Sequence, residues 1–167
     1  MDTLLPNAAR AGELLRAAKE TVAVAESSSG GLIAAALLAL PGASAFFQGG
    51  AVVYTQGARL SLLGITADAM AAIRPASEPY AVLLARTVRE RLSATWGIAE
   101  TGAAGPSGNR YGDRPGHSCI AVIGPAERVM TIETGLTDRQ ANMRAFASAV
   151  LQLFVDVLAG RGSPGAP

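Results

Sequence analysis

Apolar positions in the first forty residues alternate between helical and strand-like spacing. From residue 6 to residue 20 they recur every three or four positions, which predicts an amphipathic helix. The β-branched run Thr21–Ala25 predicts a short buried strand that ends at Glu26. The apolar run 32–40 predicts a second helix, which stops at Pro41. Strand, polar turn and helix therefore form the first α/β unit.

The same alternation continues through the middle of the chain. Residues 51–54 predict a second strand, followed by a short helix that ends at Gly64. Ser77 stands before Glu78 and Pro79, an order typical of a helix N-terminus, because a hydroxyl cap, a carboxylate and a missing N–H are all accepted there. A longer helix is expected to follow.

The last third of the chain adds strands around a long loop. Residues 97–101 predict a strand, and the five glycines of 102–116 predict a loop of the length that is usually functional or mobile. Residues 117–123 and 127–134 predict a hairpin. The sequence 137–140 reads as a capping box, so a final helix should begin there.

These elements predict an α/β fold, a three-layer α/β/α sandwich on a mixed, mostly parallel sheet. The chain has 167 residues and a mass of 16.9 kDa, which suits a single domain, expected over 1–160. The Gly-, Pro- and Ser-containing segment 161–167 is expected to be a disordered tail.

Charge and composition narrow the function classes. A formal net charge of +1 offers no basic field for a phosphate backbone, so no nucleic-acid partner is expected. The longest apolar stretch, 32–41, is too short to cross a bilayer, and no secretory signal is seen at the N-terminus, so no membrane partner is expected either. Cys119 is the only cysteine, which suits a reducing, cytoplasmic location.

Ser27 is the first candidate for chemistry. It follows a predicted buried strand and precedes a helix, so its hydroxyl should lie at the carboxyl edge of the sheet, where α/β proteins bind ligands. The backbone N–H groups of 28–31 would point to the same place, where they could hold a phosphate or stabilise an oxyanion. The alternative is that one of the three serines only caps the following helix.

The chain resembles the C-terminal domain of the CinA (competence/damage-inducible) family, whose stand-alone form is nicotinamide-nucleotide amidohydrolase. The family motif A-E-S-C-T-G-G-L-I-A is matched by 25–34, and P-G-S-S-x-x-F by 41–47. The motif G-x-V-x-Y-S-N-x-A-K-x-x-L-L-G-V is matched by 50–65, V-S-E by 76–78, and [ST]-G-I-A-G-P by 101–106. The order and spacing of the blocks are preserved.

This resemblance implies hydrolysis of the carboxamide of nicotinamide mononucleotide to nicotinic acid mononucleotide and ammonia, with no metal and no cofactor. It makes Ser27 the nucleophile and Thr101 an assisting group. The family's basic lysine is replaced by Arg59, and a guanidinium stays protonated near pH 7 and cannot serve as base. Arg59 could instead hold a phosphate or stabilise an oxyanion, or it could be a surface residue of a short helix.

Further residues are expected to bind the substrate: Glu26, Ser28, Ser29, Gly30, Gly31, Tyr54, Gly102, Gly105 and Arg114. Tyr54 could stack on the pyridine ring, or it could be a core or sheet-end tyrosine. Arg114, at the position of a family lysine, or Arg110 could meet a phosphate, and both could instead be solvated loop charges. His117 could replace the missing base if the loop folds over Ser27, or it could be a polar filler at a strand end.

Two functions follow. The first is a nicotinamide-nucleotide amidohydrolase that uses Ser27 with an altered base. The second is a catalytically impaired homologue that binds the nucleotide or a partner without turnover. In both cases a small-molecule nucleotide is the expected ligand, and the resemblance implies a homodimer or larger homo-oligomer.

Overall fold

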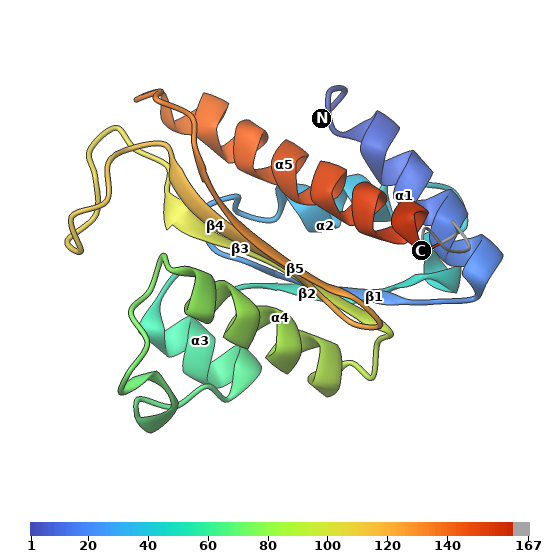
Figure 1. Ribbon diagram of the computed structural model, residues 1–167, viewed down its shortest axis with the longest axis horizontal. Coiled ribbons are helices and arrows are strands. Elements are labelled where there is room, and N and C mark those ends of the chain that lie inside the picture. The colour runs from blue at the N-terminus through green and yellow to red at the C-terminus, as the bar shows by residue number, and fades with distance from the viewer. Residues whose placement is uncertain (162–167) are drawn as a thin grey trace, which may run out of the picture.

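The computed structural model describes residues 1–161 and has three layers, a five-stranded sheet between two groups of helices (Figure 1). The α/β/α sandwich predicted from the sequence is confirmed. Two 3₁₀ helices lie at Ala43–Ala45 and Asp68–Met70. The other elements are α1 (Leu5–Ala18), β1 (Val22–Glu26), α2 (Leu32–Leu38), β2 (Phe47–Val52), α3 (Gln56–Leu63), α4 (Glu78–Arg91), β3 (Trp96–Ala103), β4 (His117–Ile123), β5 (Glu127–Glu133) and α5 (Arg139–Gly160).

The sheet has the strand order β2-β1-β3-β4-β5. Strand β1 is parallel to both β2 and β3, whereas β4 is antiparallel to β3 and to β5. Only β4 therefore runs against the others, and the sheet is mixed and mostly parallel, as predicted. Since β1, β2 and β3 share a direction, their carboxyl ends meet at one edge of the sheet.

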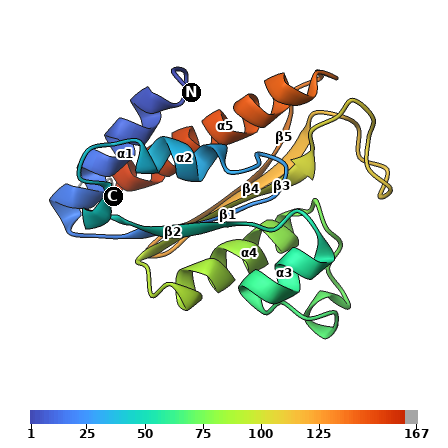
Figure 2. The same cartoon turned by 180° about the vertical axis from the view of Figure 1, so that it is seen from behind.

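Helices α1, α2 and α5 cover one face of the sheet, and α3 and α4 cover the other (Figures 1 and 2). On the first face, Trp96 and Phe154 are fully buried, with ring centres 5.7 Å apart in an edge-on arrangement. On the second face, Leu84 and Val88 of α4 pack on the alanines of β1 and β3. Each face thus has its own apolar core.

By length and composition α5, with a mean hydropathy of 1.4, is apolar enough to cross a membrane, unlike the stretch 32–41 singled out in the sequence. Part of its apolar surface is buried inside the protein. Phe146, Val150 and Phe154 are fully buried against the sheet, because α5 packs on α1, β3 and β4.

Several boundaries differ from the prediction. Strand β2 extends from Phe47 to Val52, whereas the sequence predicts 51–54. Gly49 and Gly50 lie inside the strand rather than before it. A Cβ atom on Gly50 would lie 3.1 Å from the Cβ of Ala34, so this glycine allows α2 to approach β2. The cap of α5 is Asp138, whose side chain accepts from the N–H of Ala141, and not the predicted Thr137.

Other predicted boundaries are confirmed. The Ser77 hydroxyl accepts from the N–H of Tyr80 at the start of α4, and Gly64 ends α3 in the left-handed conformation. Of the predicted tail, residues 162–167 lie outside the described part of the chain. Arg161 is described, and its Nη1 lies 2.9 Å from Oε2 of Glu20.

Candidate active site

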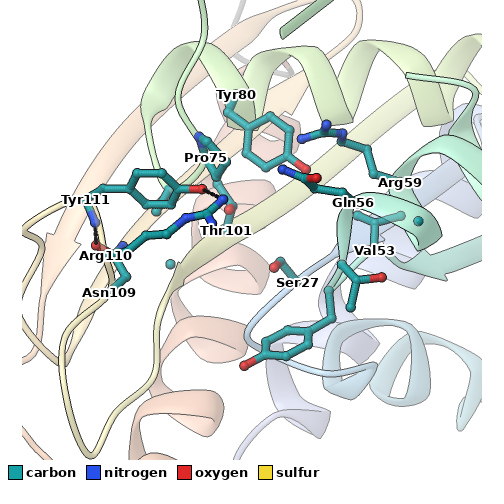
Figure 3. A pocket seen from close by; sticks show the side chains of 15 residues that line it. Ser27, Val53, Gln56, Arg59, Pro75, Tyr80, Thr101, Asn109, Arg110 and Tyr111 are labelled. Atoms are coloured by element: carbon teal, nitrogen blue, oxygen red, sulfur yellow. Dashed lines mark hydrogen bonds between the residues drawn. The ribbon is translucent and has the colours of Figure 1, made fainter. Parts of the chain in front are cut away.

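A cavity of about 530 Å³ opens at the carboxyl edge of the parallel strands (Figure 3). Ser27, directly after β1, and Thr101, near the end of β3, both line it. Its remaining walls come from the β2–α3 segment, the start of α4 and the loop before β4: Val53, Tyr54, Thr55, Gln56, Gly57, Arg59, Pro75, Ala76, Tyr80, Gly102, Asn109, Arg110 and Tyr111. The structure therefore brings together two hydroxyls that are 74 positions apart in the sequence.

Strand register explains this meeting. Ala25 of β1 pairs with Ala99 of β3, and the parallel register carried two residues further sets Ser27 beside Thr101. Successive side chains of a strand point to opposite faces. Ala25 and Ala99 belong to the core under α4, so Ser27 and Thr101, two residues further along each strand, face the α3–α4 side. The residue before each hydroxyl, at positions 26 and 100, faces α2.

Those two residues are Glu26 and Glu100, and both are buried. Oε2 of Glu26 accepts from the Ser29 hydroxyl at 2.8 Å, and its carboxylate also accepts from the N–H groups of Gly31, Ile33 and Ala34 at 2.8–3.1 Å. Burial raises the pKa of Glu26, and the donors from Ala34, Ser29 and Ile33 partly offset this. Glu26 thus caps α2 from the end of the preceding strand.

Glu100 holds the serine turn from below. Its carboxylate accepts from the hydroxyl of Ser28, from the N–H of Ser29 at 2.7 Å, and from the N–H of Ser27 at 3.3 Å. The hydroxyl of Ser118 on β4 donates to it at 3.1 Å. The sequence-based site omitted Glu100. The signal was present, because Ala99-Glu100-Thr101 repeats Ala25-Glu26-Ser27.

These bonds correct the expected oxyanion cradle. The N–H of Ser29 donates to Glu100, that of Gly31 donates to Glu26, and that of Gly30 donates to the carbonyl of Ser27 at 3.3 Å. Three of the four amides expected to face a ligand are therefore used inside the turn. The serine-cap alternative is also wrong, because the N-cap of α2 is Gly31 and Glu26 supplies the acceptor.

Arg59 lies in the cavity wall and is only 7% exposed, so the alternative of a surface arginine is wrong. Helix α3 places it there, with the Thr55 hydroxyl capping the helix four residues earlier. Its guanidinium carbon lies 5.9 Å from the centre of the Tyr80 ring, and its buried Nε has no hydrogen-bond partner in the described chain. Figure 3 shows Arg59, Gln56 and Tyr80 grouped on one side of the cavity, above Ser27.

Tyrosines provide aromatic surface around the opening. Burial raises the pKa of Tyr80, and the neighbouring guanidinium offsets this only in part, so its phenol remains a donor at neutral pH. Tyr54 is 60% exposed, and its hydroxyl accepts from Nη2 of Arg139 at 3.2 Å. Tyr54 is therefore not a core residue, and its place two residues after β2 agrees with the sheet-end alternative.

The long loop between β3 and β4 is held in place by Asp113. Arg74 donates to both oxygens of its carboxylate, at 2.6 and 2.9 Å, and the side chain of Asn109 donates to it at 2.7 Å. The Arg74 guanidinium holds the pKa of Asp113 below its usual range. This anchoring fixes Arg110 and Tyr111 at the rim of the Ser27 cavity.

Two predicted contacts of the loop lie elsewhere. Arg114 is exposed and lines a separate cavity of about 670 Å³ with His117 and Glu133, so Arg110 and not Arg114 borders the Ser27 cavity. Gly105 lines a smaller adjoining cavity of about 230 Å³, which it shares with Ser28 and Arg139. The other residues of the turn that were predicted to bind the substrate line neither of these two cavities: Glu26, Ser29, Gly30 and Gly31.

His117 does not face Ser27. Its Nδ1 lies 2.5 Å from Oε1 of Glu133, and its Nε2 lies 3.0 Å from the carbonyl oxygen of Ala76. Burial lowers the pKa of His117, but the hydrogen bonds with Glu133 and Ala76 and the charge of Asp113 outweigh this and raise it overall. Both ring nitrogens are occupied, so the structure does not support His117 as the replacement base.

The cavity has an uneven charge. Two guanidinium groups, Arg59 and Arg110, line it, and no carboxylate side chain is among its lining residues. Within residues 1–161, no three His, Cys, Asp or Glu side chains cluster closely enough to hold a metal ion. The arrangement suits an anionic organic ligand with a group that hydroxyls can reach.

Comparison with known proteins places this geometry in context. A family model described as the CinA C-terminal domain matches residues 5–158. A CinA-like protein of Gloeobacter violaceus is 42% identical over 135 residues, 80% of this chain and 31% of that protein. Another, of Desulfosudis oleivorans, is 39% identical over 146 residues, 86% of this chain and 35% of that protein. The chain thus spans about a third of the length of these curated relatives.

Solved structures agree on the fold. The crystal structure of a competence/damage-inducible protein from Agrobacterium tumefaciens matches with a TM-score of 0.85 and 26% identity, covering 94% of this chain and 96% of that one. A CinA superfamily protein from Klebsiella pneumoniae matches with a TM-score of 0.87 and 24% identity, covering 94% and 98%.

Proposed function

Because the chain belongs to the CinA C-terminal domain family, as its sequence motifs indicated, we propose that it hydrolyses the carboxamide of a nicotinamide mononucleotide, with Ser27 as nucleophile. The observation that carries this proposal is the presence of the Ser27 and Thr101 hydroxyls in the lining of one cavity. Its volume, about 530 Å³, is within the range of cavities that hold small organic ligands.

The chemistry is acyl transfer in two steps. Ser27 Oγ forms a bond to the carbonyl carbon, the C–N bond breaks, and the hydroxyl proton leaves with the nitrogen as ammonia. Water then attacks the resulting ester, which restores the Ser27 hydroxyl and releases the ring carboxylate. Thr101 lies on the same face of the sheet edge and assists at the reacting group.

The charge of the cavity supports a nucleotide ligand. Since Arg110 lies at the rim on an anchored loop, it is suited to the phosphate. Tyr54 offers an exposed aromatic face at the opening, to which a pyridine ring can stack. With three amides of the turn already engaged, positive charge for the developing oxyanion comes from Arg59.

Proton transfer is the weak step of this site. A guanidinium cannot act as a base, and the raised pKa of Tyr80 leaves its phenol protonated near neutral pH. A serine without a base is a poor nucleophile, so turnover is slow. This observation favours a second candidate function, a homologue that binds the nucleotide without hydrolysing it.

Ammonia release from nicotinamide mononucleotide tests the proposal. We expect slow release by the unaltered protein and none by Ser27→Ala, with Ser61→Ala as the control because Ser61 is exposed on α3 and outside the cavity. Arg59→Lys should raise kcat by at least ~10-fold, since a positioned base contributes about 10²–10⁴-fold. Equal ammonia from the unaltered protein and Ser27→Ala would remove Ser27 from the mechanism. No ammonia from either, with nucleotide binding retained, would favour the second candidate.

A further inference from the structure

Arg59 is a buried cation with no counter-ion among residues 1–161. The residue is 7% exposed, and no carboxylate oxygen of residues 1–161 lies within 4.0 Å of its guanidinium nitrogens. More exposed arginines, Arg74 and Arg86, do have acidic partners. A charge removed from water is costly unless it is paired. In residues 1–161 the Arg59 guanidinium has the Tyr80 ring as a neighbour but no acid, so the cavity that it lines suits an anion from outside the chain.

The ligand group that meets Arg59 can be narrowed by donors and acceptors. A guanidinium offers only N–H donors, arranged in a planar fork that fits two acceptor oxygens. A carboxamide presents one acceptor oxygen and one NH₂ donor, so half of it is mismatched against such a fork. A ring carboxylate presents two acceptors and a negative charge. Ser27 and Thr101 hydroxyls, at the same cavity, can donate to either form.

We propose that Arg59 makes this cavity selective for the acid form of its ligand, so that a pyridine nucleotide with a ring carboxylate binds more tightly than the same nucleotide with a carboxamide. The inference rests on the proposed function for the seating of the ring beside Ser27, but it concerns binding and not turnover. Its consequence is that the product of deamidation stays bound, and the site acts as a receptor for that product.

The same guanidinium chemistry also fits a phosphate, which the nucleotide carries at its other end. Arg110, at the rim of the same cavity, is the second cation available. In the proposed arrangement Arg59 meets the ring carboxylate and Arg110 meets the phosphate. Removal of Arg110 should then weaken both nucleotides equally, whereas removal of Arg59 should weaken only the acid form.

Titration calorimetry on the Ser27→Ala protein, which cannot turn the amide over, tests this directly. The probes are nicotinic acid mononucleotide, nicotinamide mononucleotide and ribose 5-phosphate. We expect the acid form to bind at least ~10-fold more tightly than the amide, as a charge-assisted bidentate contact allows. In Ser27→Ala/Arg59→Gln the ratio should fall to within about 2-fold. In Ser27→Ala/Arg110→Gln both nucleotides and ribose 5-phosphate should weaken together with the ratio unchanged.

Several results would overturn the inference. They are equal affinity for the two nucleotides, no binding of either, a preference that survives Arg59→Gln, or a loss of ribose 5-phosphate affinity in Arg59→Gln, which would assign Arg59 to the phosphate. Thermal unfolding of each variant checks that it is folded. If the preference is found but the unaltered protein releases no ammonia, the amidase proposal fails and the inference stands.

Discussion

The two faces of the sheet edge treat buried charge in opposite ways. On the α2 face, Glu26 and Glu100 are buried acids, and each accepts hydrogen bonds from four groups. On the α3–α4 face, Arg59 is a buried cation, and its Nε has no hydrogen-bond partner in the described chain. Within residues 1–161 the buried carboxylates of the first face have their hydrogen-bond donors, whereas Nε of Arg59 on the second face has no acceptor.

This difference separates structure from function at a site where the two are adjacent. Glu26 and Ser27 are neighbours in sequence, as are Glu100 and Thr101. Because successive side chains of a strand point to opposite faces, the acid and the hydroxyl of each pair lie on opposite faces of the sheet. The acids fix the backbone of the turn, and the hydroxyls remain available to the cavity. Removal of a buried acid should therefore lower the free energy of unfolding, whereas removal of Arg59 should weaken ligand binding.

The largest expected effect is that of Glu26→Ala. It leaves the hydroxyl of Ser29 and the N–H groups of Gly31, Ile33 and Ala34 without their acceptor, so the free energy of unfolding should fall by about 3–5 kcal/mol. Urea unfolding measures this. The matched control, Glu13→Ala, removes an exposed acid of α1 and should change stability by less than about 0.5 kcal/mol. A loss as small as that of the control would end the assignment of Glu26 as the cap of α2.

Glu100→Gln should have an intermediate effect. The shape is kept and the amide oxygen can still accept from the N–H groups of Ser27 and Ser29, but the charge is lost and the NH₂ group replaces the acceptor of the two serine hydroxyls, so we expect a loss of about 1–3 kcal/mol. Glu127→Gln, at an exposed acid paired with Arg86, is the control. Urea midpoints compare the two, and equal midpoints would show that the turn does not depend on the charge of Glu100.

Arg59→Met should change the stability of the ligand-free protein by less than about 1 kcal/mol, in either direction, because an apolar side chain replaces a buried charge that has no acidic partner among residues 1–161 and can still pack on the Tyr80 ring. Arg74→Met is the informative comparison. Although Arg74 is more exposed, it holds Asp113 through two hydrogen bonds, so its loss should cost more than that of Arg59. Thermal unfolding ranks the two variants, and the reverse order would contradict the contrast between the faces.

The sequence alone indicates the two candidate hydroxyls but not the residues that hold them in place. Strand and helix periods placed Ser27 after β1 and Thr101 within β3, and the parallel pairing of these strands was enough to bring them together. The register and alternation that direct Glu100 toward the serine turn are three-dimensional facts. The periodic pattern reports only that β3 is buried, which is why a fully buried glutamate in it was missed.

The loop was harder to read for a related reason. Its glycines predicted an irregular segment correctly, but the anchor is the pair formed by Arg74 and Asp113, which are 39 positions apart. That pair fixes which loop arginine borders the cavity. The family motif favours Arg114 instead, because Arg114 stands at the position of a family lysine. The two glycines 49 and 50 are typical of a break, but both lie inside β2, where Gly50 lets α2 approach and a Cβ on Gly49 would lie 3.3 Å from Leu92.

The smallest expected effect is that of His117, which is intermediate between the hydrogen-bonded buried acids and Arg59. It is buried and has partners on both nitrogens, but one of them, Glu133, is exposed at the surface. Because the pKa of His117 is raised above its usual 6.5 in the folded protein, its stabilising contribution is full below that value and is lost as the pH rises through the folded pKa. Stability should therefore fall between pH 6 and pH 9 by less than about 1 kcal/mol, since solvent screens the contact. Urea unfolding across this range measures the slope, which should shrink in Glu133→Gln. A slope that Glu133→Gln leaves unchanged would show that the contact does not hold the proton on His117.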